Sequence, residues 1–132
     1  MHQLQYLTQS NFDAALAASR TYESQFLTLG SGEVVAAPTR TEGSYRQAEQ
    51  GLLALFNSLS DAAFTELLAV AWTGRAAISN GGGDFSAHME LAVSDVKRDS
   101  TARSYLLSKG LSLRSYLENG LRRSGATFLR TF

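Results

Sequence analysis

The residues of this chain best suited to chemistry are a histidine and two aspartates within one short stretch. His88 follows Asp84 by four residues and precedes Asp95 by seven, so a helix would place all three on one face. An Asp–His pair can bind a metal ion or transfer a proton. Two ligands on one helix do not complete a metal site, however, and no second histidine-rich segment supplies the others. We therefore expect a solvated polar face here, with no metal and no cofactor.

Trp72 and Arg75 form a second candidate site, at the end of an apolar stretch. Gly74 lies between them and is placed to end the helix. We interpret Trp72 as a core anchor and Arg75 as a cation that caps exposed carbonyls or stacks on an aromatic ring. The alternative interpretation is that both side chains contact a ligand.

The glycines Gly81 to Gly83 resemble a phosphate-binding loop, because they precede a predicted helix. A P-loop needs Lys and then Ser or Thr after its glycines, whereas Asp84 would repel phosphate and cap the helix itself. The pattern therefore predicts a turn that ends in a helix cap. The sequence also lacks the serine-hydrolase, zinc-protease and calcium-loop motifs. Three carboxylates remain that only the fold could bring together: Glu66, Glu90 and Glu118.

Charge is distributed unevenly along the chain. Residues 1–96 hold four Lys/Arg against ten Asp/Glu, a net charge of −6, whereas residues 97–132 hold eight against two, a net charge of +6. This asymmetry indicates either a basic binding surface, with Arg114, Arg122 and Arg123 as candidate contacts, or two halves that fold against each other. We favour the second interpretation, since Arg114, Glu118 and Arg122 have the i,i+4 spacing of an ordinary ion ladder.

Aromatic residues accompany the cations of the C-terminal third, a mixture that single-strand nucleic-acid binders use. Tyr105 and Tyr116 lie on apolar stripes, however, so we expect both to be buried. The chain as a whole is neutral, which does not favour strong nonspecific binding to nucleic acid. Nucleic acid is therefore the less favoured partner.

Apolar spacing predicts the helices that position these residues. In chain order the helices run from Ser10 to Gly30, Tyr45 to Ser58, Asp61 to Gly74, Asp84 to Val96, Asp99 or Ser100 to Gly110, and Ser112 to Gly125. On the fourth helix the inward side chains are expected to be Phe85, Met89, Ala92, Val93 and Val96. Residues 30–43 are expected to form a surface connection, with a brief extended piece at Val34–Val35. Sustained strand-like alternation is missing, so the fold class is all-α.

Length and composition predict one compact bundle of about five to six amphipathic helices. The 132 residues are 44% hydrophobic and can bury roughly two-thirds of the unfolded surface without a staple. The lack of cysteine excludes disulfides, thiol nucleophiles and thiolate zinc sites. The N-terminus has neither a basic leader nor a long apolar run. We therefore expect a soluble, cytoplasmic, single-domain protein over residues 1–132, with a short tail at 126–132.

Four pieces of the sequence together resemble a known family. They are Trp72-x-Gly74-Arg75, Asp84-Phe85, Thr101-Ala102-x-x-Tyr105-Leu106-Leu107 and Leu113-x-x-Tyr116-Leu117-Glu118-x-Gly120-Leu121. In this order and at this spacing they are similar to the small bacterial helical proteins known as domain of unknown function 3775, most closely over residues 60–125. The resemblance implies helical architecture and bacterial origin, and it implies no activity. Ala76 to Gly83 is longer than the usual acidic turn of the family, and the C-terminal third is more basic.

The sequence favours a non-catalytic module that binds another macromolecule, most simply another protein. We expect no membrane association, and a homodimer is open because Phe128, Leu129 and Phe132 follow the last helix. One alternative is a phage-borne inhibitor of a host defence complex, in which the segregated charge would serve mimicry. A second alternative is a small ligand-binding protein or enzyme with a pocket near Arg75, Asp84 and His88.

Overall fold

The computed structural model describes residues 3–30, 43–78, 84–98 and 101–132, without the side chains of 25–30 and 43–45. Within these residues the elements are β1 (Gln3–Leu4), α1 (Gln9–Gly30), α3 (Gly43–Ser58), α4 (Asp61–Ile78), α5 (Phe85–Arg98), α6 (Ala102–Leu107), α7 (Gly110–Ser124) and β2 (Thr127–Phe128). The all-α, single-domain prediction is confirmed. Three predictions lie outside the described residues: residues 31–42 of the predicted surface connection, with its extended piece at Val34–Val35, the turn Gly81–Gly83, and the helix start at Asp99 or Ser100.

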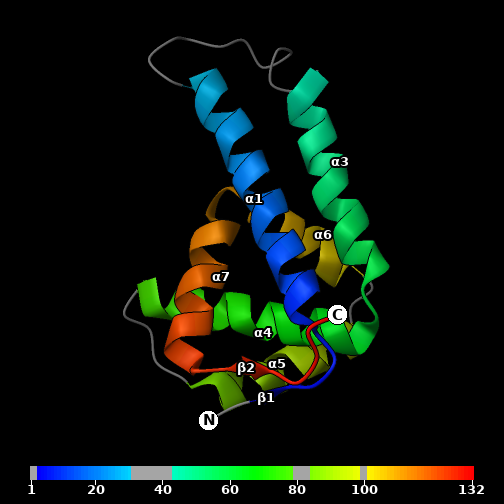
Figure 1. Ribbon diagram of the computed structural model, residues 1–132, viewed down its shortest axis with the longest axis vertical. Coiled ribbons are helices and arrows are strands. Elements are labelled where there is room, and N and C mark those ends of the chain that lie inside the picture. The colour runs from blue at the N-terminus through cyan, green and yellow to red at the C-terminus, as the bar shows by residue number, and fades with distance from the viewer. Residues whose placement is uncertain (1–2, 31–42, 79–83, 99–100) are drawn as a thin grey trace.

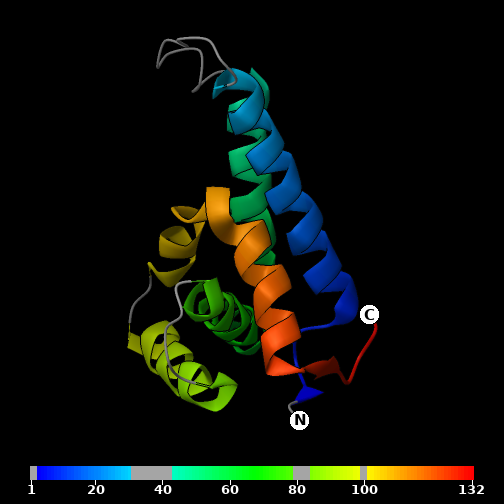
Figure 2. The ribbon, with the colours of Figure 1, turned by 90° about the vertical axis from the view of Figure 1, so that its left-hand side faces the viewer.

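Helix α4 lies at the centre of the fold. It packs against α7 and against α5, while α1 packs against α3 and α7 and α6 packs against α3. Figure 1 shows α1 and α3 side by side as a long pair, with α4 crossing their lower ends and α5 beneath it. Figure 2 shows the same arrangement from the side, where α5 and α6 lie on the face away from the two chain ends.

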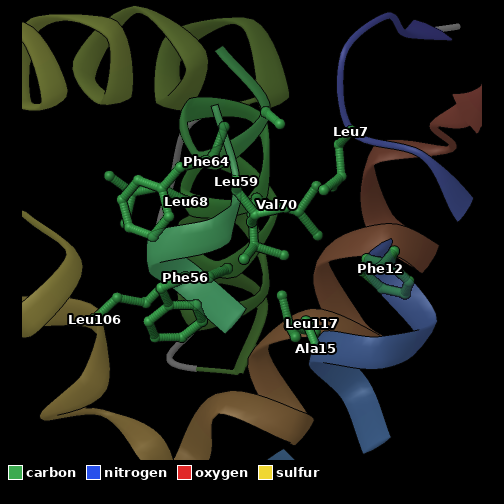
Figure 3. Close-up of a cluster of buried hydrophobic side chains, with 14 of the residues drawn as sticks. Leu7, Phe12, Ala15, Phe56, Leu59, Phe64, Leu68, Val70, Leu106 and Leu117 are labelled. Atoms are coloured by element: carbon green, nitrogen blue, oxygen red, sulfur yellow. The ribbon is translucent and has the colours of Figure 1, made fainter. Parts of the chain in front are cut away.

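The core forms around α4 because the middle of this helix is mostly apolar and is buried on all sides. Every residue from Ala63 to Ala71 is buried, which is typical of a helix that is surrounded by other elements. Figure 3 shows side chains from α1, α3, α6 and α7 converging on it. Phe56 of α3 and Phe64 of α4 meet edge to face with ring centroids 5.7 Å apart, a preferred aromatic geometry.

Gly74 does not end α4, contrary to the sequence prediction, because the helix continues to Ile78. Gly74 instead lies where α4 crosses α7, opposite Gly120. A Cβ atom on Gly74 would overlap the carbonyl oxygen of Tyr116, and a Cβ atom on Gly120 would overlap that of Val70. The two helices therefore approach so closely that only glycine fits on either side. Gly125 does end α7 as predicted, in the left-handed conformation with φ 64°.

The N-terminal segment is held by a buried carboxylate of α4. Glu66 is only 5% exposed, and its oxygens accept hydrogen bonds from the backbone N–H groups of Gln5 at 2.8 Å, Tyr6 at 2.8 Å and Leu7 at 2.6 Å. Hydrogen bonds to a charged acceptor are stronger than neutral ones. Glu66 therefore ties the chain before α1 to the centre of the fold.

The C-terminal tail is an ordered part of the fold rather than a loose end. β1 and β2 pair in parallel, with Gln3 opposite Thr127 and Leu4 opposite Phe128. Beyond β2, the carbonyl oxygens of Arg130 and Thr131 each accept a hydrogen bond at 3.0 Å from the first two N–H groups of α1. Helix α1 begins at Gln9, one residue before the predicted start at Ser10, and its cap is Thr8, whose Oγ1 accepts a hydrogen bond from the N–H of Asn11 at 3.0 Å.

Candidate functional site

A groove runs between α4, α5 and α6, and we call it the α4–α5–α6 groove. Its outer compartment has a volume of about 370 Å³, and its inner compartment has a volume of about 200 Å³. The outer compartment is lined by Trp72, Arg75, Ala76, His88, Leu91, Asp95 and Tyr105. The inner compartment shares Trp72, Asp95 and Tyr105 and adds Leu68 and Ala102.

Helical spacing positions most of this lining. On α5, His88, Leu91 and Asp95 are three or four residues apart, so they form one stripe along the groove. On α4, Leu68 and Trp72 are separated by one turn, and Arg75 follows three residues later. Cationic and imidazole groups therefore lie in the outer compartment, whereas Asp95 lines both compartments.

The structure brings together three residues that the sequence singled out as binding contacts. Trp72, Arg75 and His88 come from two helices and line the same outer compartment. Asp84 does not join them: its side chain is exposed, and its Oδ1 accepts a hydrogen bond from the N–H of Ala87 at 2.9 Å. Asp84 is thus the predicted cap of α5. A binding role for these residues stays a prediction.

Four predictions about side-chain burial need correction. Tyr116 was expected to be buried and is only partly buried, although it packs against the core. Trp72 packs against the core as predicted but is only partly buried, because it also lines the groove. Tyr105 was expected inside and is 44% exposed, because α6 is short and turns Ala102 and Leu106 toward the core instead. Val93 was also expected inside and is 48% exposed, since α5 buries Phe85 and Ala92.

His88 has an unusual environment within the groove. Its Nε2 atom is buried and has no hydrogen-bond partner among the described residues, which costs free energy because a polar atom leaves water uncompensated. We expect His88→Leu to raise the free energy of unfolding by about 1 kcal/mol. Denaturant melts would measure this change, with Ser86→Leu at an exposed position of α5 as the control for helix propensity. A His88→Leu protein less stable than the parent would contradict the expectation.

Two basic residues of the C-terminal third, Arg103 and Arg114, pair with acidic residues of the N-terminal part. Arg114 contacts Glu23 of α1 at 2.8 Å and Glu118 at 2.6 Å, and Arg20 contacts Glu118 at 3.8 Å. Hydrogen bonds to Glu23, and next to Glu118, raise the pKa of Arg114 above its ordinary value. These contacts between α1 and α7 support the interpretation that the oppositely charged halves fold against each other.

Arg103 also makes contacts that stabilise the fold. One of its guanidinium nitrogens donates to the carbonyl oxygen of Phe56 and the other contacts Asp61 at 2.8 Å. The same group lies 4.7 Å from the centre of the Phe64 ring.

The predicted contacts Arg122 and Arg123 remain exposed on α7. They are therefore better positions than Arg114 for testing a basic binding face.

A comparison with protein families matches residues 49–126 to the family described as a protein of unknown function (DUF3775). This match spans more than half of the 132-residue chain. The protein belongs to the DUF3775 family. Comparisons with curated proteins and with solved structures find no match. The DUF3775 match begins within α3 and ends after α7, so the complete lining of the α4–α5–α6 groove lies inside it, whereas α1 precedes it.

The three carboxylates singled out in the sequence of this DUF3775 protein do not form a shared site. Glu66 binds the N-terminal backbone, Glu118 pairs with arginines on α1 and α7, and Glu90 is exposed on α5. Within the described ranges, no three His, Cys, Asp or Glu side chains are grouped to hold a metal ion. In the same ranges no helix has both the length and the apolar character needed to cross a membrane.

Proposed function

We propose that this protein is a non-catalytic interaction module that receives a segment of another protein in the α4–α5–α6 groove. The observation that carries the proposal is the composition of the outer compartment. Trp72, Leu91 and Tyr105 offer apolar surface that is partly or largely accessible. Binding sites typically combine such surface with a few polar groups that fix the orientation of the ligand.

The polar groups of the groove are arranged along its length. Arg75 and His88 line only the outer compartment, while Asp95 also reaches the inner one. His88 and Asp95 are seven residues apart on α5, which corresponds to about 10 Å along the helix axis. An extended peptide covers that distance in about three residues. The groove therefore suits a short extended segment whose ends differ in charge.

A second hollow on the other side of α5 is the competing surface. It has a volume of about 350 Å³ and is lined by Tyr6, Asp61, Ala62, Thr65, Met89, Val93, Val96 and Lys97. Among the described residues, its lining contains no arginine or histidine and only one aromatic side chain. We favour the α4–α5–α6 groove because Trp72 and Tyr105 give it more aromatic surface than Tyr6 gives the second hollow.

Two matched variants on α5 test this proposal. Leu91 is 57% exposed in the groove, and Val93 is 48% exposed beside the second hollow. Leu91→Arg would place a cation four residues before Asp95, where it would pair with that carboxylate and fill the groove. We expect a displayed library of random peptides to yield the same sequence families on the parent and on Val93→Arg, and to yield none of them on Leu91→Arg.

The result that would overturn the proposal is equal enrichment on the parent and Leu91→Arg, with loss on Val93→Arg. That outcome would assign binding to the second hollow. Melting curves of both variants provide the control for folding, since substitutions at exposed sites usually change stability by less than about 0.5 kcal/mol.

A small anionic ligand is the second candidate occupant, because Arg75 and His88 line the same compartment. A ligand that binds the native state raises the melting temperature by mass action. A panel of nucleotides, phosphates and carboxylic acids would therefore distinguish this candidate from the peptide proposal. A saturable rise that disappears in Arg75→Gln would favour the small ligand.

A further inference from the structure

Among the described residues that line the inner compartment of the groove, only one carries a charge. Leu68, Trp72, Ala102 and Tyr105 are uncharged, so the carboxylate of Asp95 determines the sign of the local potential. Asp95 is half-buried and makes no hydrogen bond or ion pair within the part of the chain that the structure describes. A half-buried carboxylate is less screened by solvent than an exposed one. The inner compartment therefore favours a positive charge.

The basic residues near the inner compartment contact other groups or line other hollows. On α5, Lys97 lines the second hollow, and Arg98 donates to Ser94 Oγ at 2.7 Å. On α6, Arg103 binds the carbonyl oxygen of Phe56 and the carboxylate of Asp61. Arg75 lines the outer compartment but not the inner one. Neither these cations nor Lys109, which lies beside the Tyr105 ring, forms an ion pair with Asp95 within the described ranges.

The walls of the compartment strengthen the preference for a cation. Trp72 and Tyr105 line it together, and the faces of tryptophan and tyrosine rings attract ammonium and guanidinium groups. The Tyr105 ring already has such a neighbour, because Lys109 Nζ lies 5.4 Å from its centre. The volume of about 200 Å³ is below the range typical of drug-sized ligands, so it suits one side chain.

We propose that the inner compartment accepts a lysine or arginine side chain of the partner segment, held by Asp95 and flanked by Trp72 and Tyr105. This inference rests on the proposed function of the groove. A carboxylate would be repelled by Asp95. An apolar side chain would bury the Asp95 carboxylate without a partner, which is unfavourable. The groove therefore selects its partner by a basic residue at one position.

The fluorescence of Trp72 provides a direct test, because it is the only tryptophan in the chain. Three capped tripeptides that carry lysine, arginine or norleucine between two glycines would be titrated into the intact protein. We expect the lysine and arginine peptides to bind about tenfold more tightly than the norleucine peptide. Their binding should weaken as salt is added, since an ion pair contributes to it.

Asp95→Asn and Glu90→Gln form a matched pair for this test. Each removes one negative charge from α5, but Asp95 lines the groove and Glu90 is exposed and does not. We expect Asp95→Asn to remove the tenfold preference and Glu90→Gln to keep it. Asp95→Asn should fold normally, because Asp95 makes no ion pair within the described ranges.

The outcomes separate the two proposals. Equal binding of all three peptides, with loss in Leu91→Arg, would overturn the basic side-chain inference and leave the groove function standing. An unchanged preference in Asp95→Asn would also overturn the inference. If none of the peptides changes the Trp72 signal and the library selections do not depend on Leu91, both the inference and the proposed function are wrong.

Discussion

Gly74→Ala is expected to lower the free energy of unfolding by about 3 kcal/mol or more. The added methyl group would overlap the backbone carbonyl of Tyr116 and lie 2.7 Å from the amide nitrogen of Gly120. A flexible side chain could move aside, but backbone cannot do so without separating α4 from α7. Because α4 is the centre of the core, such a separation would loosen most of the fold. Denaturant unfolding followed by Trp72 fluorescence would measure the loss.

Two further variants belong to this experiment: Gly120→Ala repeats the test from the other helix, and Gly51→Ala is the control. A methyl group on Gly120 would overlap the carbonyl of Val70 from the opposite side, so the same loss is expected. Gly51 lies exposed within α3, and a methyl group there would meet nothing within 4 Å. Gly51→Ala should therefore stabilise the protein by about 0.5–1 kcal/mol through helix propensity. If Gly74→Ala were as stable as Gly51→Ala, the close crossing of α4 and α7 would be wrong.

Glu66→Gln is expected to cost about 3 kcal/mol of stability. The carboxylate accepts three backbone hydrogen bonds from Gln5, Tyr6 and Leu7. A glutamine amide has an NH₂ group in place of one carboxylate oxygen. This NH₂ donor would face a backbone N–H donor of the N-terminal segment. The bond from Leu7 is buried and those from Gln5 and Tyr6 are partly buried, so water does not readily replace them. A melting temperature lower by about 10 °C would express this cost in a domain of this size.

Hydrogen exchange would locate the effect of Glu66→Gln. The amides of residues 5–7 should lose protection first, because Glu66 is their acceptor. Loosening should then spread to the β1–β2 pair, since Leu129 donates its N–H to the carbonyl of Leu4 at 2.9 Å. Glu90→Gln, an exposed carboxylate on α5, is the control and should change stability by less than about 0.5 kcal/mol. Uniform loss of protection across all helices would argue against Glu66 as a local tie.

Gly74 and Glu66 both lie on α4. Each stabilises the protein through a contact with a segment that is far away in the chain. The binding tests concern the neighbouring face of the same helix, where Trp72 and Leu68 line the groove. A variant that weakens the core would therefore also disturb the groove, so binding variants must be chosen at exposed positions such as Leu91.

The sequence by itself determined the helical segments and many of their ends, because these depend on local spacing and caps. The predicted boundary between the last two helices was wrong, since α6 ends at Leu107 and Gly110 begins α7. Apolar periodicity predicted the helix that became α1 and its end at Gly30, and the end of α3 at Ser58. Asp84 capped α5 as its side chain predicted, and Gly125 ended α7 because it tolerates a positive φ. The i,i+4 pair of Arg114 and Glu118 also followed from spacing alone.

Only the tertiary structure decided what the glycine Gly74, the carboxylate Glu66 and the candidate site do. A glycine that ends a helix and one that admits a second helix look identical in sequence, since the difference lies in the distant residue opposite, here Gly120. Glu66 found its donors about sixty positions away in the chain. The groove likewise required three helices to bring Trp72, Asp95 and Tyr105 together, because spacing along a single helix carries no information about the neighbours against which it packs.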